Sequence, residues 1–366
     1  KGGFEHFMMK EIHEQPKAAE DTLHKYIVEG EDGNKKIDLS STGLDEEAIK
    51  KISQIYYVAC GSAWHVGMQA KYVFEDLCDL PVSADLASEF RYSKAHLNKD
   101  GLVVIISQSG ETADSLAALR MAKETGLKTL AIVNVVGSSI AREADYVMYT
   151  VAGPEISVAT TKAYSCQLLC TFMLAAEFAR IRKADNDYGH YLDELMGIPE
   201  KMAKTLEDKE RIQWFASKYA NAHDIFFIGR GIDYAICLEG SLKMKEISYI
   251  HSESYAAGEL KHGTISLIED GTLVIGALTQ SDLYEKTLSN MMECKSRGAY
   301  LMGVTAYGKY DVEDSVNFSV YVPKVDEHFI GSLAIIPLQL LGYYISVAKG
   351  LDVDKPRNLA KSVTVE

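Results

Sequence analysis

The sequence predicts an α/β protein made of two tandem doubly wound domains, each a three-layer αβα unit with a mostly parallel sheet. Its length of 366 residues suggests two domains, at ~150 residues per domain. Short runs rich in Val and Ile alternate with longer amphipathic stretches, which is the pattern of repeated βαβ units. The order of these segments occurs twice along the chain, and this indicates a tandem duplication.

The duplication is visible in pairs of similar segments. The run IYYVACGSAWHVG (55–67) has the same form as IFFIGRGIDYAI (225–236), and LVVIISQSG (102–110) the same form as TLVIGALTQS (272–281). Apolar runs of this length without polar alternation are typical of strands that are covered on both faces. We therefore expect two copies of one fold rather than two unrelated domains.

Helices are predicted by their periodicity and their ends. Residues 114–126 place apolar side chains on one face and stop at Gly126, as helices with a C-terminal glycine do. Residues 8–29 show an amphipathic helical pattern that is interrupted at Pro16. Residues 351–366 have no helical periodicity and are expected to form an extended tail.

These elements divide the chain into three parts. The predicted boundaries are an N-terminal helix with the first domain, the second domain, and the C-terminal tail, at 1–200, 201–350 and 351–366. The chain begins with Lys1 and not with methionine, so we expect it to be a piece of a longer polypeptide.

Composition and charge exclude several classes of function. The 38 basic and 52 acidic residues give a net charge of -14, which argues against nucleic acid and against an anionic membrane surface as partners. We find no run of ~18 apolar residues, so no membrane span is expected. The six cysteines lie in apolar stretches and are expected to be reduced thiols of a cytoplasmic protein. No cluster of metal-ligand residues is evident, and neither a metal nor a cofactor is expected.

The segment SQSGET (107–112) follows a predicted buried strand and opens a helix. Free backbone N–H groups meet the positive end of the helix dipole at this point of a doubly wound sheet. The side chains of Ser107, Gln108, Ser109 and Thr112 add neutral donors, and no lysine of a nucleotide-binding P-loop is present. The pattern favours a monophosphate, although Ser and Thr that only cap the helix would look the same.

The second copy differs at the equivalent loop, LTQSDLYEKT, where Asp282 would repel an anion. One working phosphate loop per chain is therefore expected. The small-residue turn CGSA (60–63) in the first copy is a second candidate for close approach to a ligand, and tight packing between strand and helix would explain it as well.

The segment 237–263 is the densest candidate for chemistry. It places Lys243 and Glu246 on one face of a helix, and His262 follows after a break that contains glycine. A carboxylate, an ammonium group and an imidazole are the groups that an aldose–ketose proton transfer needs. A solvated Lys–Glu pair and a packed histidine are the alternative interpretation. In the tail, Lys355, Arg357 and Lys361 form either a frayed terminus or a strap over an anionic site.

Taken together, several motifs resemble the isomerase half of the glucosamine-6-phosphate synthases, the glutamine–fructose-6-phosphate amidotransferases. They cover the chain from residue 8 to its end and look closer to the eukaryotic form than to the bacterial one. In order, they are ACGSAWH, SQSGETADSL, VATTKAY, LEGSLKMKEISYIHSESYAAGELKHG and PRNLAKSVTVE. The family has two sugar-isomerase (SIS) domains in tandem, which matches the predicted duplication.

The resemblance implies a role for each matching residue. The loop side chains and the Gly61–Ser62 turn would hold the phosphate of fructose 6-phosphate. Main-chain groups at three further positions would contact its sugar. Glu246 would move a proton between C1 and C2, Lys243 would stabilise charge at the C1 and C2 oxygens, and His262 of a neighbouring subunit would open the ring. Lys361 would reach the C2 carbonyl. The loop side chains are Ser107, Gln108, Ser109 and Thr112, and the main-chain positions are Val158, Thr160 and Ala360.

The resemblance also implies partners and a product. The active unit would be at least a homodimer, a glutaminase domain with a catalytic N-terminal cysteine is missing, and UDP-N-acetylglucosamine would inhibit by feedback. The chain would make glucose 6-phosphate alone and glucosamine 6-phosphate when ammonia is supplied. Two alternatives stay open, namely a non-catalytic SIS module that senses a sugar phosphate, and an isomerase of the phosphoglucose isomerase kind.

Overall fold

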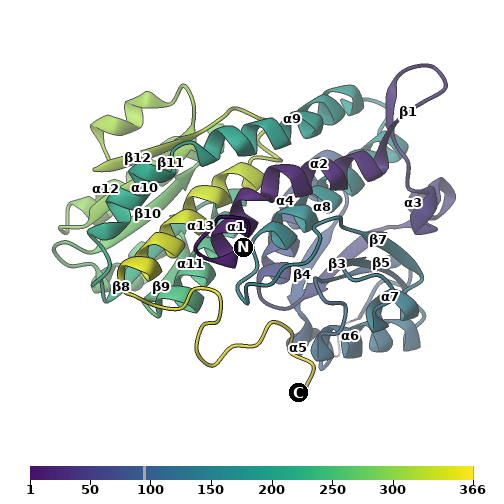
Figure 1. The fold of residues 1–366 in the computed structure, drawn as a ribbon. Coiled ribbons are helices and arrows are strands. Elements are labelled where there is room, and N and C mark those ends of the chain that lie inside the picture. Colours follow the sequence, from purple (N-terminus) through teal and green to yellow (C-terminus); the bar gives the residue numbers. More distant parts are fainter. Residues whose placement is uncertain (94–95, 366) are drawn as a thin grey trace. The chain divides into compact units, whose positions relative to one another are not determined.

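The computed structural model describes residues 1–93 and 96–365, so Glu366, the last residue of the predicted tail, lies outside the described residues. The chain forms two compact units, each with its own parallel sheet and flanking helices (Figure 1). One unit holds the first sheet and consists of 15–155, 162–199 and 360–366. The other holds the second sheet and consists of 1–14, 156–161 and 200–359.

The first sheet has five parallel strands in the order β4-β3-β5-β6-β7. Its strands are β3 (Gln54–Ala59), β4 (Val82–Leu86), β5 (Gly101–Ser107), β6 (Lys128–Val133) and β7 (Tyr146–Tyr149). Its helices are α4 (Ser62–Cys78), α5 (Ala87–Phe90), α6 (Ala113–Glu124), α7 (Ser139–Glu143) and α8 (Lys162–Arg182). Every residue of β5 is buried, as a strand covered on both faces requires.

The same unit contains the segments that precede the first sheet. They are α2 (Gln15–Tyr26), a hairpin of β1 (Ile27–Glu29) and β2 (Lys35–Ile37), the short helix η1 (Ser40–Thr42) and α3 (Glu46–Lys51). Pro16 lies in the first turn of α2, where a missing N–H costs nothing. The predicted leading helix is therefore two helices, because α1 (Phe7–His13) ends just before Gln15.

The second sheet repeats the first, with the order β12-β11-β10-β8-β9 and parallel pairing throughout. Its strands are β8 (Asp224–Gly229), β9 (His251–Ala256), β10 (Leu273–Leu278), β11 (Tyr300–Ala306) and β12 (Phe318–Val322). Its longer helices are α10 (Lys209–Ser217), α11 (Ile232–Ser248), α12 (Tyr284–Lys295) and α13 (Gly331–Ala348), and its longest continuous segment begins within α9 (Tyr188–Leu206). The predicted duplication and the predicted doubly wound fold are confirmed.

Short 3-10 helices connect the elements of the second sheet. They are η2 (Ala257–His262), η3 (Thr264–Leu267), η4 (Ser281–Leu283) and η5 (Tyr310–Asp314). The tail after α13 contains no helix or strand over residues 351–365, as expected, and it is drawn in yellow in Figure 1.

Helix α13 corrects the expectation that no membrane-length apolar segment exists. Its 18 residues, Gly331–Ala348, are long and apolar enough to cross a membrane. However, 83% of this segment is buried within the structure, and it packs against α10 and α11. A helix that is apolar all round is also what the core of a large domain uses, and burial of this extent favours that explanation.

Candidate functional site

The predicted phosphate loop connects β5 to α6 and closes on itself through its hydroxyl groups. Ser107 is the last residue of β5, and Thr112 is the N-cap of α6. The Ser107 Oγ atom accepts a hydrogen bond from the N–H of Gly110 at 3.0 Å and lies 2.9 Å from Thr112 Oγ1. The loop thus presents hydroxyl groups at the N-terminus of a twelve-residue helix, where an anion is stabilised.

Backbone N–H groups after β6 and in α7 donate hydrogen bonds to the phosphate loop. The N–H of Asn134 donates to the carbonyl of Gln108 at 3.2 Å, and the N–H of Ile140 donates to the carbonyl of Gly110 at 3.0 Å. The N–H of Ser139 donates to the Glu111 carboxylate at 2.8 Å, and this hydrogen bond lowers the pKa of Glu111. The loop's own carboxylate is therefore directed to a backbone donor. Sequence reasoning did not find this contact, because the residues are 28 positions apart.

Gly110 is the position in the loop where a side chain cannot be accommodated. Its φ is +67°, and a Cβ atom there would lie 2.0 Å from the Ser138 hydroxyl oxygen. We expect Gly110→Ala to fold but to raise the Kd for fructose 6-phosphate at least tenfold, because the loop must shift away from α7. Calorimetric titration checks this, with the exposed Gly126, which also has a positive φ but no neighbour within 4 Å, as the matched Gly→Ala control. Equal affinity in the two variants would contradict the assignment of the loop.

The turn after β3 has the geometry expected for close approach of a ligand. Gly61 has a φ of +57° and precedes α4, and Ser62, the first residue of α4, is buried. The preceding Cys60 is partly buried, and burial raises the pKa of its thiol. The other five cysteines are buried and form no disulfide in the described part of the chain.

The end of the tail belongs to the same unit as the phosphate loop. The Nζ atom of Lys361 lies 2.5 Å from Oε1 of Glu155, whose side chain is fully buried and also accepts the N–H of Ala163 at 2.9 Å. The next residue, Ser362, donates its hydroxyl to Ser109 Oγ at 3.0 Å. Ala360, predicted for the sugar pocket, directly precedes these two contacts and is exposed. Glu155 was not predicted, because 206 positions separate it from its lysine.

The second unit holds the predicted proton-transfer pair on α11. Lys243 is fully buried, and its Nζ atom lies 2.5 Å from Oε2 of Glu246 and 3.4 Å from Oε1 of Glu239. The Glu246 side chain is 21% exposed, whereas the Glu239 side chain is fully buried. The alternative of a solvated Lys–Glu pair is wrong, since an ammonium group is taken out of water only with strong partners. Glu239, one turn before Lys243, is a member of this group that sequence reasoning missed.

The other predicted residues of this unit lie outside its α-helices and strands. His262 ends η2 and is exposed. Val158 and Thr160 lie on the segment 156–161, which is held by the buried Glu11 carboxylate and by a main-chain carbonyl. The Glu11 carboxylate accepts the N–H of Ile156 at 2.6 Å, and the carbonyl of Asp354 accepts the N–H of Val158 at 3.0 Å. The main chain at Val158 is thus fixed, as a main-chain sugar contact would require.

The second copy's equivalent loop is occupied by carboxylates of the chain itself. The N–H of Thr279 donates to Asp233 at 2.9 Å, and the N–H of Ser281 donates to Glu327 at 3.1 Å. The expected cause, repulsion by Asp282, is not the whole explanation, because Asp282 is exposed and these two carboxylates already accept N–H groups of the loop. An incoming phosphate would have to displace them. The prediction of one working phosphate loop per chain gains a structural reason here.

Asp233 also gives this loop a pH dependence. Burial raises its pKa from 3.8 to about 6, so the folded chain holds this proton more tightly than the unfolded chain does. Stability from this group is therefore complete below pH ~4 and is lost as the pH rises to ~6, by roughly 1.4 kcal/mol per pKa unit. We expect Asp233→Asn to become more stable relative to the parent as the pH rises through this window. Urea unfolding of both proteins from pH 4 to 7 checks this, and parallel curves would contradict it.

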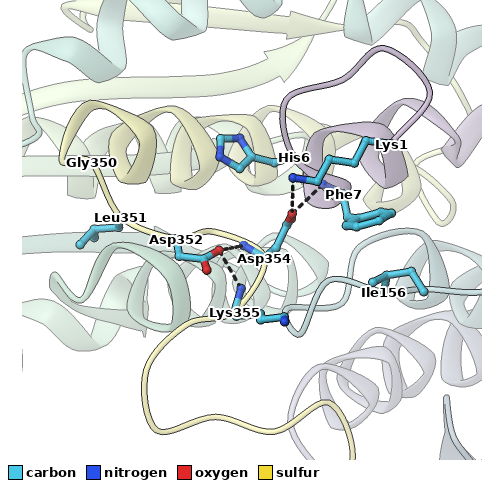
Figure 2. Close-up of a pocket in the computed structure, with 9 residues that line it drawn as sticks. All are labelled: Lys1, His6, Phe7, Ile156, Gly350, Leu351, Asp352, Asp354 and Lys355. Atoms are coloured by element: carbon cyan, nitrogen blue, oxygen red, sulfur yellow. Dashed lines mark hydrogen bonds and ion pairs between the residues drawn. The ribbon is translucent and has the colours of Figure 1, made fainter.

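A cavity of about 640 Å³ lies in the unit of the second sheet, and one of its lining residues, Asp354, is the hydrogen-bond partner of the Val158 main chain. It is lined by Lys1, His6, Phe7, Ile156, Gly350, Leu351, Asp352, Asp354 and Lys355 (Figure 2). Figure 2 shows Asp354 directed to the backbone of Phe7, where its carboxylate accepts an N–H at 2.8 Å. Lys355 of the predicted strap lines this cavity, whereas the predicted catalytic and substrate-binding residues do not.

Comparison with known proteins shows the family. The family model for the SIS domain matches residues 48–177 and 218–349, which are the two copies described above. The C-terminal domain of glucosamine-fructose-6-phosphate aminotransferase from Francisella tularensis has 36% sequence identity and a TM-score of 0.90. That match covers 97% of this chain and 99% of the Francisella chain.

Curated relatives agree with this structural match. Glutamine–fructose-6-phosphate aminotransferase (isomerizing) from Clostridium tetani is 53% identical over 368 residues, which is 100% of this chain and 60% of the relative. The protein of the same name from Methanosarcina mazei is 45% identical over 368 residues, which is 100% of this chain and 59% of the relative. The chain thus spans about 60% of the length of the curated relatives it matches.

The relatives also correct one expectation. They are bacterial and archaeal, so the expected likeness to the eukaryotic form is wrong. The two matched SIS regions, the repeated sheets and the full-length structural match agree with one another. The chain therefore belongs to the family of paired SIS domains that forms the C-terminal domain of glutamine–fructose-6-phosphate aminotransferases.

Proposed function

We propose that the chain binds fructose 6-phosphate, opens its ring and moves a proton between C1 and C2 to give glucose 6-phosphate. The observation that carries this proposal is the fully buried Lys243 ammonium group in contact with the partly exposed Glu246 carboxylate. A module that only senses a sugar phosphate needs the phosphate loop but has no use for a buried cation beside an accessible base. The names of the relatives, aminotransferases that isomerise, support the same reaction.

Neutral donors would hold the substrate. The side chains of Ser107, Gln108, Ser109 and Thr112 and the Gly61–Ser62 turn would bind the phosphate, together with the N-terminus of α6. The main chain at Val158, Thr160 and Ala360 would contact the sugar. This set of donors explains how a chain with a net charge of -14 accepts an anionic substrate.

Four side chains would perform the chemistry. His262 would move the ring-hydroxyl proton so that the ketose opens, and Glu246 would take the proton from C1 and return it to C2. Lys243 would stabilise the negative charge that develops on the C1 and C2 oxygens in the enediolate. Lys361 would reach the C2 carbonyl of the ketose. Lys361 is paired with the buried Glu155, so it must leave that carboxylate or pass a proton to it before its nitrogen can react.

Amino transfer would need a part of the relatives' sequence that this chain does not cover. We propose that ammonia released by a glutaminase domain converts the same substrate to glucosamine 6-phosphate, the first step toward UDP-N-acetylglucosamine, in the cytoplasm. His262 is exposed, in keeping with its predicted use by the neighbouring subunit of a homodimer or larger assembly. The prediction of inhibition by UDP-N-acetylglucosamine depended on likeness to eukaryotic members, and because the relatives reported above are bacterial and archaeal, this inhibition is not part of the proposal.

An assay with fructose 6-phosphate as sole substrate tests the proposal. Glucose-6-phosphate dehydrogenase couples any glucose 6-phosphate to NADPH, and we expect steady formation of NADPH without glutamine or ammonia. Saturable binding without product would favour the sensor. A chain truncated before Lys355 separates a third possibility, because an isomerase of the phosphoglucose isomerase kind would not depend on this tail.

A further inference from the structure

We propose that Ser362 in the tail is a positioning residue for the phosphate loop: its hydroxyl turns the Ser109 hydroxyl into a donor directed at the bound phosphate. The inference rests on the proposed function only for the identity of the ligand. It assigns a role to a residue outside the predicted phosphate-binding set, and it follows from hydrogen-bond directions within one unit.

The Ser109 hydroxyl accepts two hydrogen bonds. Its Oγ atom accepts the N–H of Glu111 at 3.2 Å and the hydroxyl of Ser362 at 3.0 Å. A hydroxyl oxygen has two lone pairs and one proton, so both acceptor positions of Ser109 are filled. Its own proton must therefore be donated outward, and among the described residues no acceptor receives it. A phosphate oxygen at the N-terminus of α6 is an acceptor of the right kind.

Without Ser362, this direction is no longer imposed. One lone pair of Ser109 would become free, and its hydroxyl could rotate to accept from water or from another N–H group of the loop. A hydroxyl that must reorient before it donates to an anion binds that anion less tightly, because fixing its orientation then costs part of the binding free energy. Ser362 thus acts on phosphate through Ser109 and need not touch the ligand.

The main chain on either side holds Ser362 in place. The carbonyl of Val363 accepts the N–H of Ala113 at 3.1 Å, so the tail also satisfies a free donor in the first turn of α6. On the other side, Lys361 is held by the fully buried Glu155 carboxylate at 2.5 Å. The Ser362 hydroxyl therefore lies within a segment that is held at three successive residues, 361–363. This anchoring gives the contact a defined geometry in an otherwise extended tail.

The proposal is tested by the affinity for inorganic phosphate, measured by calorimetric titration, beside kcat and KM for fructose 6-phosphate. For Ser362→Ala we expect a three- to tenfold rise in the Kd of phosphate and in KM, the loss typical of one hydrogen bond, with kcat changed less than twofold. Ser362→Thr keeps the hydroxyl and should restore both constants. Val365→Ala, at a side chain that is 74% exposed in the same tail, is the matched control and should equal the parent.

A double-mutant cycle separates this role from a structural one. If Ser362 acts through Ser109, Ser109→Ala and the double variant Ser109→Ala/Ser362→Ala should bind phosphate equally. Independent, additive losses would overturn the proposal, and so would an unchanged Kd in Ser362→Ala or a loss of kcat at constant KM. Equal melting temperatures without ligand confirm that the variants are folded.

Phosphate binding does not require turnover, so the positioning role of Ser362 and the proposed isomerase reaction are tested by separate measurements. A chain that makes no glucose 6-phosphate but whose phosphate affinity follows the pattern above contradicts the proposed reaction and leaves the role of Ser362 intact. A parent chain that does not bind phosphate contradicts the role of Ser362.

Discussion

Glu246→Gln is expected to lower the rate of isomerisation by about 10²–10⁴-fold, the contribution typical of a positioned general base. Glutamine has nearly the same shape as glutamate but cannot take the proton from C1. The Lys243 side chain would remain beside it, because the amide oxygen of glutamine can still accept the hydrogen bond that now measures 2.5 Å. The Kd for fructose 6-phosphate should change little, since the phosphate loop belongs to other elements of the chain. Coupled kinetics and calorimetric titration on one preparation check both statements.

Glu285→Gln provides the matched control for this variant. Glu285 lies exposed in the first turn of α12, and its replacement also removes one negative charge. It should leave kcat and Kd unchanged. Near-normal turnover of Glu246→Gln would contradict the assignment of the base, whereas loss of binding along with turnover would indicate a structural role for Glu246.

Lys243→Met is expected to have the largest effect on stability. It removes the ammonium group that lies 3.4 Å from the fully buried Glu239 and 2.5 Å from Glu246. Removal of one partner from a buried ion pair costs about 3–5 kcal/mol, because the remaining charge stays desolvated. Isomerisation should be lost as well, since no cation then stabilises the enediolate. Urea unfolding at pH 7 and the coupled assay measure the two effects.

A second substitution separates the two roles of Lys243. In Lys243→Met/Glu239→Gln the buried charge on Glu239 is also removed, so most of the lost stability should return while activity stays absent. Full activity in either variant would show that Lys243 is not needed for the chemistry. An unchanged free energy of unfolding in Lys243→Met would show that the ion pair does not stabilise the fold.

The fold was predictable because its signals are local and repeated. Runs such as 102–107 are apolar without alternation, and the structure buries every residue of that strand. Gly126 marks the end of a helix in the sequence, and it has a φ of +83° just after α6. The similar segments of the second copy supported the interpretation of the first, whereas the strand order and the register were not predicted.

Local patterns in the sequence singled out candidate site residues that are close together, although they missed the buried Glu239 four positions before Lys243. Ser107–Thr112 and Lys243–Glu246 lie within one loop and one helix. Their long-range partners, Glu155 for Lys361 and Ser139 for Glu111, are acidic or small residues with no local pattern of their own. The same reason explains why the carboxylates of Asp233 and Glu327 in the second-copy loop were missed.

The most direct test of the account follows fructose 6-phosphate by ¹H NMR in D₂O with the parent chain, without glutamine or ammonia. Proton transfer between C1 and C2 by Glu246 predicts that the H1 and H2 signals of glucose 6-phosphate grow, with partial deuterium at C2 from exchange of the base with solvent. The Glu246→Gln variant should show neither signal over the same time. Glucose 6-phosphate formed equally by both proteins, or by neither, would contradict the account.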